Sequence, residues 1–195
     1  VYKRQRFNIL SAVISFSTAV KAEQNHIKTV GIITPYAAQV RLIRAMLKDY
    51  YTKGTTNVSC ATVHQFQGSE SDVIVFDAVE SYPKSAVGYL MGKEPNQVAR
   101  LINVAITRGK GKVITVANAR FWENVFKGTN HIFYKLLQHI KNGKHHVIDN
   151  HDKTLKPYIE SVNPGRMINI FMNEQDAISM FEQDMNCLIY TSDAA

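Results

Sequence analysis

The sequence predicts an α/β fold, with a parallel sheet covered by helices on both faces. Short apolar runs rich in β-branched residues recur along the chain, as expected of strands buried on both sides. Between them lie segments whose apolar residues follow the helical period. This alternation is typical of parallel strands joined by crossover helices.

The first half of the chain begins with a predicted helix at residues 8–22. The β-branched run at residues 29–33 then predicts a buried strand, and residues 36–51 return to the helical period. A turn cluster at residues 53–57 separates this helix from a second predicted strand at residues 58–63.

The same alternation continues through the next part of the chain. A third strand is predicted at residues 73–79 and a helix at residues 96–107. A fourth strand at residues 112–117 leads into a short helix at residues 119–126, and a further helix follows at residues 131–141. We therefore expect one α/β domain over residues 6–127.

Beyond this domain the pattern changes. Residues 128–164 comprise the last of these helices and a polar stretch that predicts a linker. Residues 165–186 suit a strand followed by a helix, the start of a possible further domain. Residues 1–5 and 187–195 resemble translated adapter sequence from DNA library preparation, so we expect these ends to be adapter-derived and exclude them from the fold prediction.

Composition sets broad limits. The chain has 195 residues, 45% of them hydrophobic, enough for one ordinary core. Its net charge of +7 is compatible with a polyanionic partner, although proteins that never bind nucleic acid share such values. No apolar run approaches the roughly 20 residues of a membrane span, so no membrane partner is expected. Cys60 and Cys187 suggest neither a disulfide framework nor a metal-ligand spacing, and we expect a cytoplasmic setting.

Three short segments contain the candidate site: residues 34–39 (TPYAAQ), 62–70 (TVHQFQGSE) and 103–108 (NVAITR). We expect each where an apolar strand gives way to a loop or helix, the position from which α/β domains present polar side chains to ligands. In this order and spacing they resemble motifs IV, V and VI of superfamily 1 helicases, in the Upf1-like branch. The resemblance implies a RecA-like domain of the P-loop NTPase type, the second of two motor domains.

The resemblance also implies cofactors and partners. ATP would bind between this domain and an upstream RecA-like domain of the same polypeptide, with Mg²⁺ held mainly by the upstream domain. Single-stranded DNA or RNA would occupy a groove across both domains. The chain contains no Gly-x-x-x-x-Gly-Lys-Ser/Thr segment, so we expect no ATPase activity from it alone.

The second segment offers contacts to both ligands. Thr62 could donate its hydroxyl to a nucleic-acid phosphate, with His64 as a supporting polar contact. Gly68 permits a positive φ or the close approach of a ligand. Glu70 matches the acidic residue for which the resemblance implies a contact to the ATP ribose, and Gln67 would support it. The alternative is a turn that only caps helix amides.

Arg108 is the strongest candidate for a catalytic residue. It matches the arginine finger of motif VI. Such a finger stabilises the charge on the transferred phosphoryl group and raises the rate of hydrolysis by about three to five orders of magnitude. Gly109 follows it where the family usually has alanine. This glycine loosens the end of the helix, so the helix fixes the position of the arginine less firmly. Without the family, an arginine before Gly-Lys-Gly-Lys is more often a solvated turn.

The first segment ends a strand and starts a helix. The resemblance implies that Thr34, Pro35 and Tyr36 face the nucleic-acid groove or the interdomain cleft. Pro35 stops ladder pairing and suits the first turn of a helix. Tyr36 could stack on a base or pack against the next strand, and both interpretations stay open.

Two other patterns are not expected to be functional. Residues 74–77 (IVFD) look like a Walker B strand, but there is no phosphate cradle for its metal to serve. Four histidines lack the spacing of a zinc module, and we expect no metal site from them: His139, His145, His146 and His151.

Two alternative functions stay open. The chain could be a non-catalytic nucleic-acid-binding scaffold that has kept the fold. It could also belong to a nuclease-fused repair or defence protein, because residues 165–186 weakly resemble the opening of a phospholipase-D-like domain.

Overall fold

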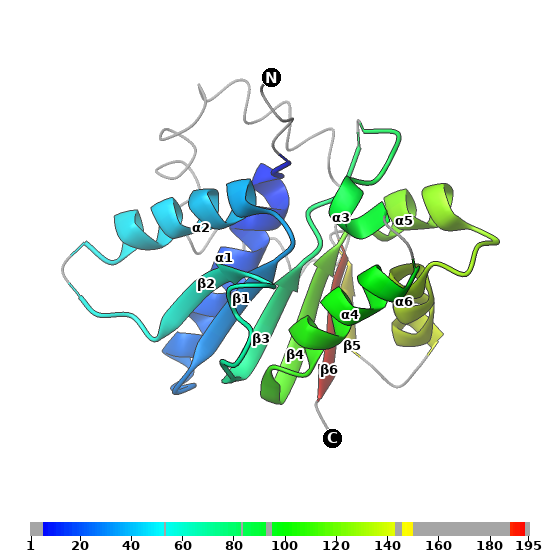
Figure 1. Cartoon of the computed structure of the whole chain (residues 1–195). Coiled ribbons are helices and arrows are strands. Elements are labelled where there is room, and N and C mark those ends of the chain that lie inside the picture. Colours follow the sequence, from blue (N-terminus) through cyan, green and yellow to red (C-terminus); the bar gives the residue numbers. More distant parts are fainter. Residues whose placement is uncertain are drawn as a thin grey trace.

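The structure is a computed structural model that describes residues 6–52, 54–82, 84–92, 95–142, 146–149 and 188–193. Its centre is a six-stranded sheet with the order β2-β1-β3-β4-β6-β5 (Figure 1). The first four strands are parallel, and β6 and β5 extend the sheet as an antiparallel pair. The strands are β1 Val30–Thr34, β2 Val58–Thr62, β3 Ser71–Asp77, β4 Gly109–Ala117, β5 His146–Asp149 and β6 Leu188–Asp193.

Helices cover both faces of this sheet. Helices α1 and α2 pack on one face, while α4, α5 and α6 pack on the other, where the short α3 lies next to α4 (Figure 1). The helices are α1 Ile9–Gln24, α2 Ala37–Tyr50, α3 Tyr89–Gly92, α4 Pro95–Ile106, α5 Ala119–Phe126 and α6 Ile132–Asn142. The predicted α/β fold with a RecA-like parallel sheet is confirmed.

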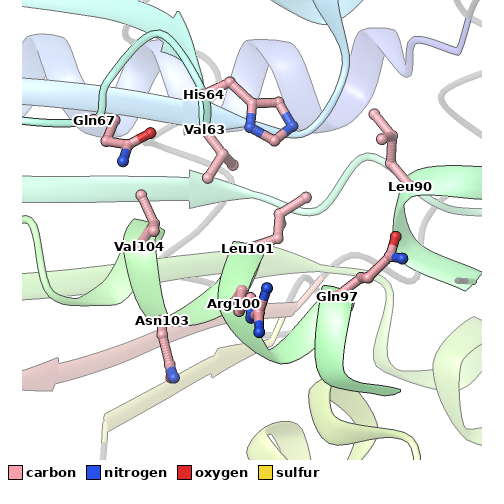
Figure 2. Close-up of a pocket in the computed structure, with 9 residues that line it drawn as sticks. All are labelled: Val63, His64, Gln67, Leu90, Gln97, Arg100, Leu101, Asn103 and Val104. Carbon is pink, nitrogen blue, oxygen red and sulfur yellow. The ribbon is translucent and has the colours of Figure 1, made fainter. Parts of the chain in front are cut away.

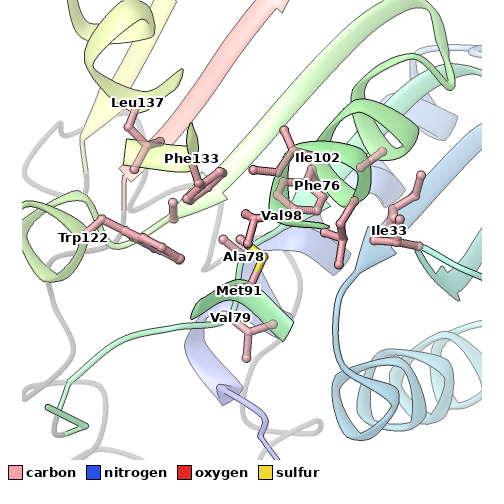
Figure 3. Packing of buried hydrophobic residues seen from close by; sticks show 14 of the residues in the cluster. Ile33, Phe76, Ala78, Val79, Met91, Val98, Ile102, Trp122, Phe133 and Leu137 are labelled. Atoms are coloured by element: carbon pink, nitrogen blue, oxygen red, sulfur yellow. The ribbon is translucent and has the colours of Figure 1, made fainter. Parts of the chain in front are cut away.

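Each face has its own hydrophobic core because successive strand residues point to opposite sides. Ile32 and Val75 join the core under α1 and α2, while Ile33 and Phe76 join the core under α4 and α6. Figure 3 shows this second core, where side chains from several elements meet around Phe76. Burial on both faces explains why the central strands are continuous apolar runs.

Asparagine side chains fix the starts of two helices. Asn8 accepts a hydrogen bond from the amide of Ser11 at 3.1 Å and caps α1. Asn118 accepts one from the amide of Phe121 at 3.0 Å and caps α5. Both are N-cap positions, where asparagine satisfies an otherwise unpaired amide.

Three features differ from the sequence prediction. Strand β5 lies within the stretch predicted to be a linker, and β6 lies within a segment excluded from the prediction. Helix α3 was not predicted. Short strands are recognised by their partners rather than by their own pattern, and β5 pairs only with the sequence-distant β6. The predicted strand and helix within residues 165–186 lie outside the described residues, so the domain limits stay predictions.

Between β2 and β3 the chain runs back across the sheet. Because the two strands are parallel neighbours of β1, residues 63–70 (the crossing segment) must return from the carboxyl edge of the sheet to its amino edge, about 20 Å away. Phe66 anchors this segment, since its side chain is only 4% exposed and packs in the core beneath α4. The crossing segment therefore lies along the α4 face of the sheet.

Candidate functional site

The predicted site residues lie at two opposite edges of the sheet, one formed by the carboxyl ends of the parallel strands and the other by their amino ends, and the crossing segment connects the two. Thr34 and Thr62 pair in register at the carboxyl edge. Glu70 and Arg108 immediately precede β3 and β4 and therefore lie at the amino edge. The expectation that all three segments present side chains where strands end is wrong for these two residues, because the chain has crossed the sheet before Glu70.

The amino edge brings together residues far apart in sequence. The amide of Ser71 donates a hydrogen bond to the carbonyl of Arg108 at 3.0 Å. Beside it, Nζ of Lys110 lies 3.5 Å from Oε2 of Glu70, with both side chains more than half exposed. The acidic residue of the second segment and the arginine of the third therefore occupy neighbouring positions on one open edge.

Arg108 follows the end of α4 by two residues, and its guanidinium packs back against the last turn of that helix. Its Nε donates to the carbonyl of Val104 at 3.2 Å, and Nη2 donates to Oγ1 of Thr107 at 3.3 Å. A cation at this position interacts favourably with the carboxyl end of the helix. Both hydrogen bonds are long, and Arg108 is partly exposed. The side chain is therefore held in place weakly and can leave the helix for an anion.

A pocket of about 530 Å³ lies between the crossing segment, α3 and α4 (Figure 2). In the figure, Leu101 and Val104 point from α4 toward Val63, and these apolar side chains form its floor. Polar side chains form the rim. The lining residues are Val63, His64, Gln67, Leu90, Gln97, Arg100, Leu101, Asn103 and Val104. The pocket thus unites Gln67 and His64, one predicted to support nucleotide binding and the other nucleic-acid binding.

Comparison with known proteins identifies the family. Residues 5–120, more than half of the chain, match the family described as AAA domain. The chain belongs to this family. Several curated relatives of this AAA domain are named helicases, which confirms the resemblance to Upf1-like superfamily 1 helicases.

Three relatives illustrate the match. Helicase sen1 of Schizosaccharomyces pombe is 36% identical over 90 residues, which are 46% of this chain and 5% of that protein. DNA polymerase alpha-associated DNA helicase A of Saccharomyces cerevisiae is 38% identical over 90 residues, 46% of this chain and 12% of that protein. ATP-dependent helicase NAM7 of the same yeast is 33% identical over 112 residues, 54% of this chain and 10% of that protein. The chain thus spans a small part of each relative.

The first predicted segment of this helicase domain is buried. Thr34 is 0% exposed, and its Oγ1 has no hydrogen-bond partner. Pro35 is buried, and the ring of Tyr36 is 8% exposed within the core under α4. In this structure Tyr36 therefore packs, as one of the two interpretations held, and its ring is not placed to stack on a base.

Glu80 explains how Tyr36 is held, and the sequence analysis missed this residue. Its fully buried carboxylate accepts hydrogen bonds from the Tyr36 hydroxyl and from the amide of Gly88, the latter at 2.8 Å. Nη1 of Arg6 completes the set at 2.6 Å. Burial and the neighbouring Glu80 carboxylate raise the pKa of Tyr36 far above its ordinary range. A glutamate three positions beyond the apolar strand β3 is the signal for this network in the sequence.

Asp77 is enclosed by donors at the carboxyl end of β3. Nε2 of Gln39 donates to its carboxylate at 2.7 Å and the amide of Val79 at 2.9 Å, and the residue is 0% exposed. Burial raises the pKa of Asp77 to about 6, although these hydrogen bonds oppose the shift. Val79 has a φ of 66°, a strained value for a β-branched residue. Asp77 is thus an internal anchor of the loop, closed to a metal ion.

The described residues offer no metal centre. No group of three or more His, Cys, Asp or Glu side chains among them is placed to hold a metal ion. His145 and His151 lie outside the described residues. Within the same described ranges, no helix is both long and apolar enough to span a membrane.

Proposed function

We propose that this chain is the C-terminal motor half of an ATP-dependent nucleic-acid helicase or translocase. The observation that carries the proposal is the placement of Glu70 and Arg108 side by side on one open edge. In motors of two such domains, the second domain completes the nucleotide site with a cation that reaches the transferred phosphoryl group. The family of this domain and the names of its relatives support the same function.

The amino edge is suited to one side of a bound nucleotide. Arg108 is the proposed arginine finger, since its guanidinium is partly exposed and held by two long hydrogen bonds. Glu70 would accept a hydrogen bond from the ribose in place of its exposed partner Lys110. Gly68 is exposed with a φ of 87°, so the turn beside Glu70 has open backbone for a ligand, and Gln67 would support the contact.

Mg²⁺ does not fit the described residues of this domain. Asp77, the carboxylate that the sequence pattern suggested, is buried and saturated with hydrogen bonds. Glu70 is a single carboxylate, already paired with Lys110. We therefore assign Mg²⁺ to an upstream RecA-like domain, which would also supply the phosphate cradle that this chain lacks.

Single-stranded DNA or RNA is the proposed polymer substrate. Thr62 and His64 lie where β2 passes into the crossing segment, and His64 is exposed. The Thr62 hydroxyl accepts a long hydrogen bond of 3.3 Å from the amide of Gln65, so its own proton stays available to a phosphate. Thr34, Pro35 and Tyr36 would support this edge from beneath. Nucleotide-driven closure and opening against the upstream domain would then move the strand.

The decisive experiment replaces Arg108 in the complete protein. Arg108→Ala should lower ATP turnover by about three to five orders of magnitude while nucleotide binding persists, because the finger acts on charge in the transition state. Arg120→Ala provides a matched control, since Arg120 is an exposed arginine on α5 outside the pocket. Turnover in Arg108→Ala equal to that of the control would contradict the assignment.

A non-catalytic nucleic-acid-binding scaffold is the second candidate. It would keep the fold of this domain without a working partner domain, and a degenerate Walker A lysine in the upstream domain would distinguish it. A complete protein that binds single strands but hydrolyses no ATP would support the scaffold. Strand-stimulated hydrolysis would exclude it. The chain alone should bind strands without turnover under either candidate.

A further inference from the structure

We propose that the pocket between the crossing segment and α4 receives one nucleobase of the bound single strand. This inference rests on the proposed function and adds a base contact to it. Tyr36, for which the sequence left base stacking open as one of two interpretations, packs in the core. The pocket provides an apolar surface of the required kind on the face that the crossing segment exposes.

The floor of the pocket suits a planar aromatic ring. Val63 and Leu101 are buried beneath it, and the partly exposed Leu90 and Val104 complete the apolar surface. A volume of about 530 Å³ is within the range of pockets that bind small organic molecules, and it exceeds the size of one base with its sugar. A base in this pocket would bury one of its faces against the apolar floor, while its other face would stay in contact with solvent.

The rim suits the edges of a base and its phosphate. Gln67, Gln97 and Asn103 carry side-chain amides, each of which can both donate and accept hydrogen bonds, as base edges require. Arg100 and His64 add a guanidinium and an imidazole, and no carboxylate is among the nine lining residues. In the described part of the chain, these five side chains make no hydrogen bond or ion pair. Their hydrogen-bonding capacity is therefore available to a ligand.

The position of the pocket favours the strand over the nucleotide as the source of the base. Of the residues proposed to meet the nucleotide, Gln67 lines the pocket, whereas Glu70 and Arg108 do not. His64 lines it, two residues beyond the end of β2, where the strand is proposed to pass. Gln97 lies about 14 Å from Ile106, the last residue of α4, along the helix axis, so this end of the pocket is the one farther from Arg108.

The test measures how strand affinity depends on bases, using the 195-residue chain itself. Fluorescence anisotropy compares a short labelled oligothymidylate with an abasic oligonucleotide of the same length and phosphate count. A base in the pocket should make the normal strand bind about tenfold more tightly, which is at the low end of the effect of a base stacked on an aromatic ring because this floor is aliphatic. AMP and ATP serve as competitors. If the pocket binds a mononucleotide in preference to a base of the strand, they should displace the strand.

Two variants localise the effect. Val104→Phe fills the floor and should reduce the preference for the normal strand to nearly nothing while abasic binding persists. His64→Ala changes an exposed rim residue without touching the core, so it tests the pocket even if Val104→Phe does not fold. It should weaken the normal strand more than the abasic strand. Arg120→Gln is the control for loss of a surface charge away from the pocket.

The outcomes separate this inference from the proposed function. Equal affinity for normal and abasic strands would overturn the base pocket and leave strand binding intact. Tight AMP binding that His64→Ala weakens, with no base preference in the strand, would assign the pocket to a mononucleotide and also overturn the inference. Failure to bind either oligonucleotide would contradict both proposals.

Discussion

Gly31 is the position where one added methyl group should disturb the candidate site. A Cβ there would lie 2.5 Å from Cζ of Phe66 and 2.8 Å from Cδ1 of Ile74. Carbon atoms prefer separations of about 3.5–4.0 Å, so the ring of Phe66 would have to retreat by about 1 Å. Phe66 and Ile74 are 4% and 0% exposed, which leaves little room for this movement.

Gly31→Ala should therefore lower the free energy of unfolding by about 1–3 kcal/mol, the usual cost of overpacking a core. Denaturant unfolding of the chain, followed by circular dichroism, measures this change. Gly54→Ala is the matched control, because a Cβ there meets nothing within 4 Å. The control should change stability by less than about 0.5 kcal/mol.

A double-mutant cycle tests the cause. Phe66→Leu removes the ring atoms that the new methyl group would meet, at the cost of a cavity. In the Phe66→Leu background, Gly31→Ala should cost about 0.5–3 kcal/mol less than it does alone, the range found for residues in contact. Additive effects within about 0.5 kcal/mol would refute the proposed packing of the crossing segment on β1.

Two further substitutions test the buried network at the carboxyl edge. Burial raises the pKa of Asp77 from 3.8 to about 6, so the folded chain retains a proton that the unfolded chain releases. This proton's contribution to stability, about 3 kcal/mol, should be complete below pH ~4 and lost as the pH rises through 6. Stability curves of the chain and of Asp77→Asn should diverge across that window, and parallel curves would contradict the assignment. Tyr36→Phe removes a donor from the buried Glu80 carboxylate and should lower the free energy of unfolding by about 1–3 kcal/mol. An unchanged denaturation midpoint would show that this hydrogen bond contributes nothing.

Local patterns in the sequence were sufficient for most of the secondary structure. Residues 36–51 show the helical period because one side of α2 meets the sheet, whereas α1, predicted from the same spacing at residues 8–22, is buried on all sides from Leu10 to Val20. The β-branched runs at β1 and β3 are buried on both faces and read as strands for that reason. Strand β5 could not be predicted this way, since four residues gain their strand character from the neighbour they pair with.

The candidate site shows the same division. Glu70 and Arg108 could be singled out from their motifs. Their proximity in space could not be predicted, because it depends on the pairing of β3 with β4. Tyr36 was open to two interpretations, because a tyrosine after a strand can face a ligand or the core. The carboxylate of Glu80, distant in sequence, decides between them by holding its hydroxyl inside.

The sequence by itself determined the α/β class, the positions of most helices and strands and the helicase family, because these depend on local periodicity and short motifs. Only the tertiary structure decided which edge of the sheet each candidate residue occupies. Since parallel strands β2 and β3 begin at the same edge, the connection between them must cross the sheet. That crossing places Glu70 beside Arg108 and forms the pocket against α4, a result of strand order that no single segment encodes.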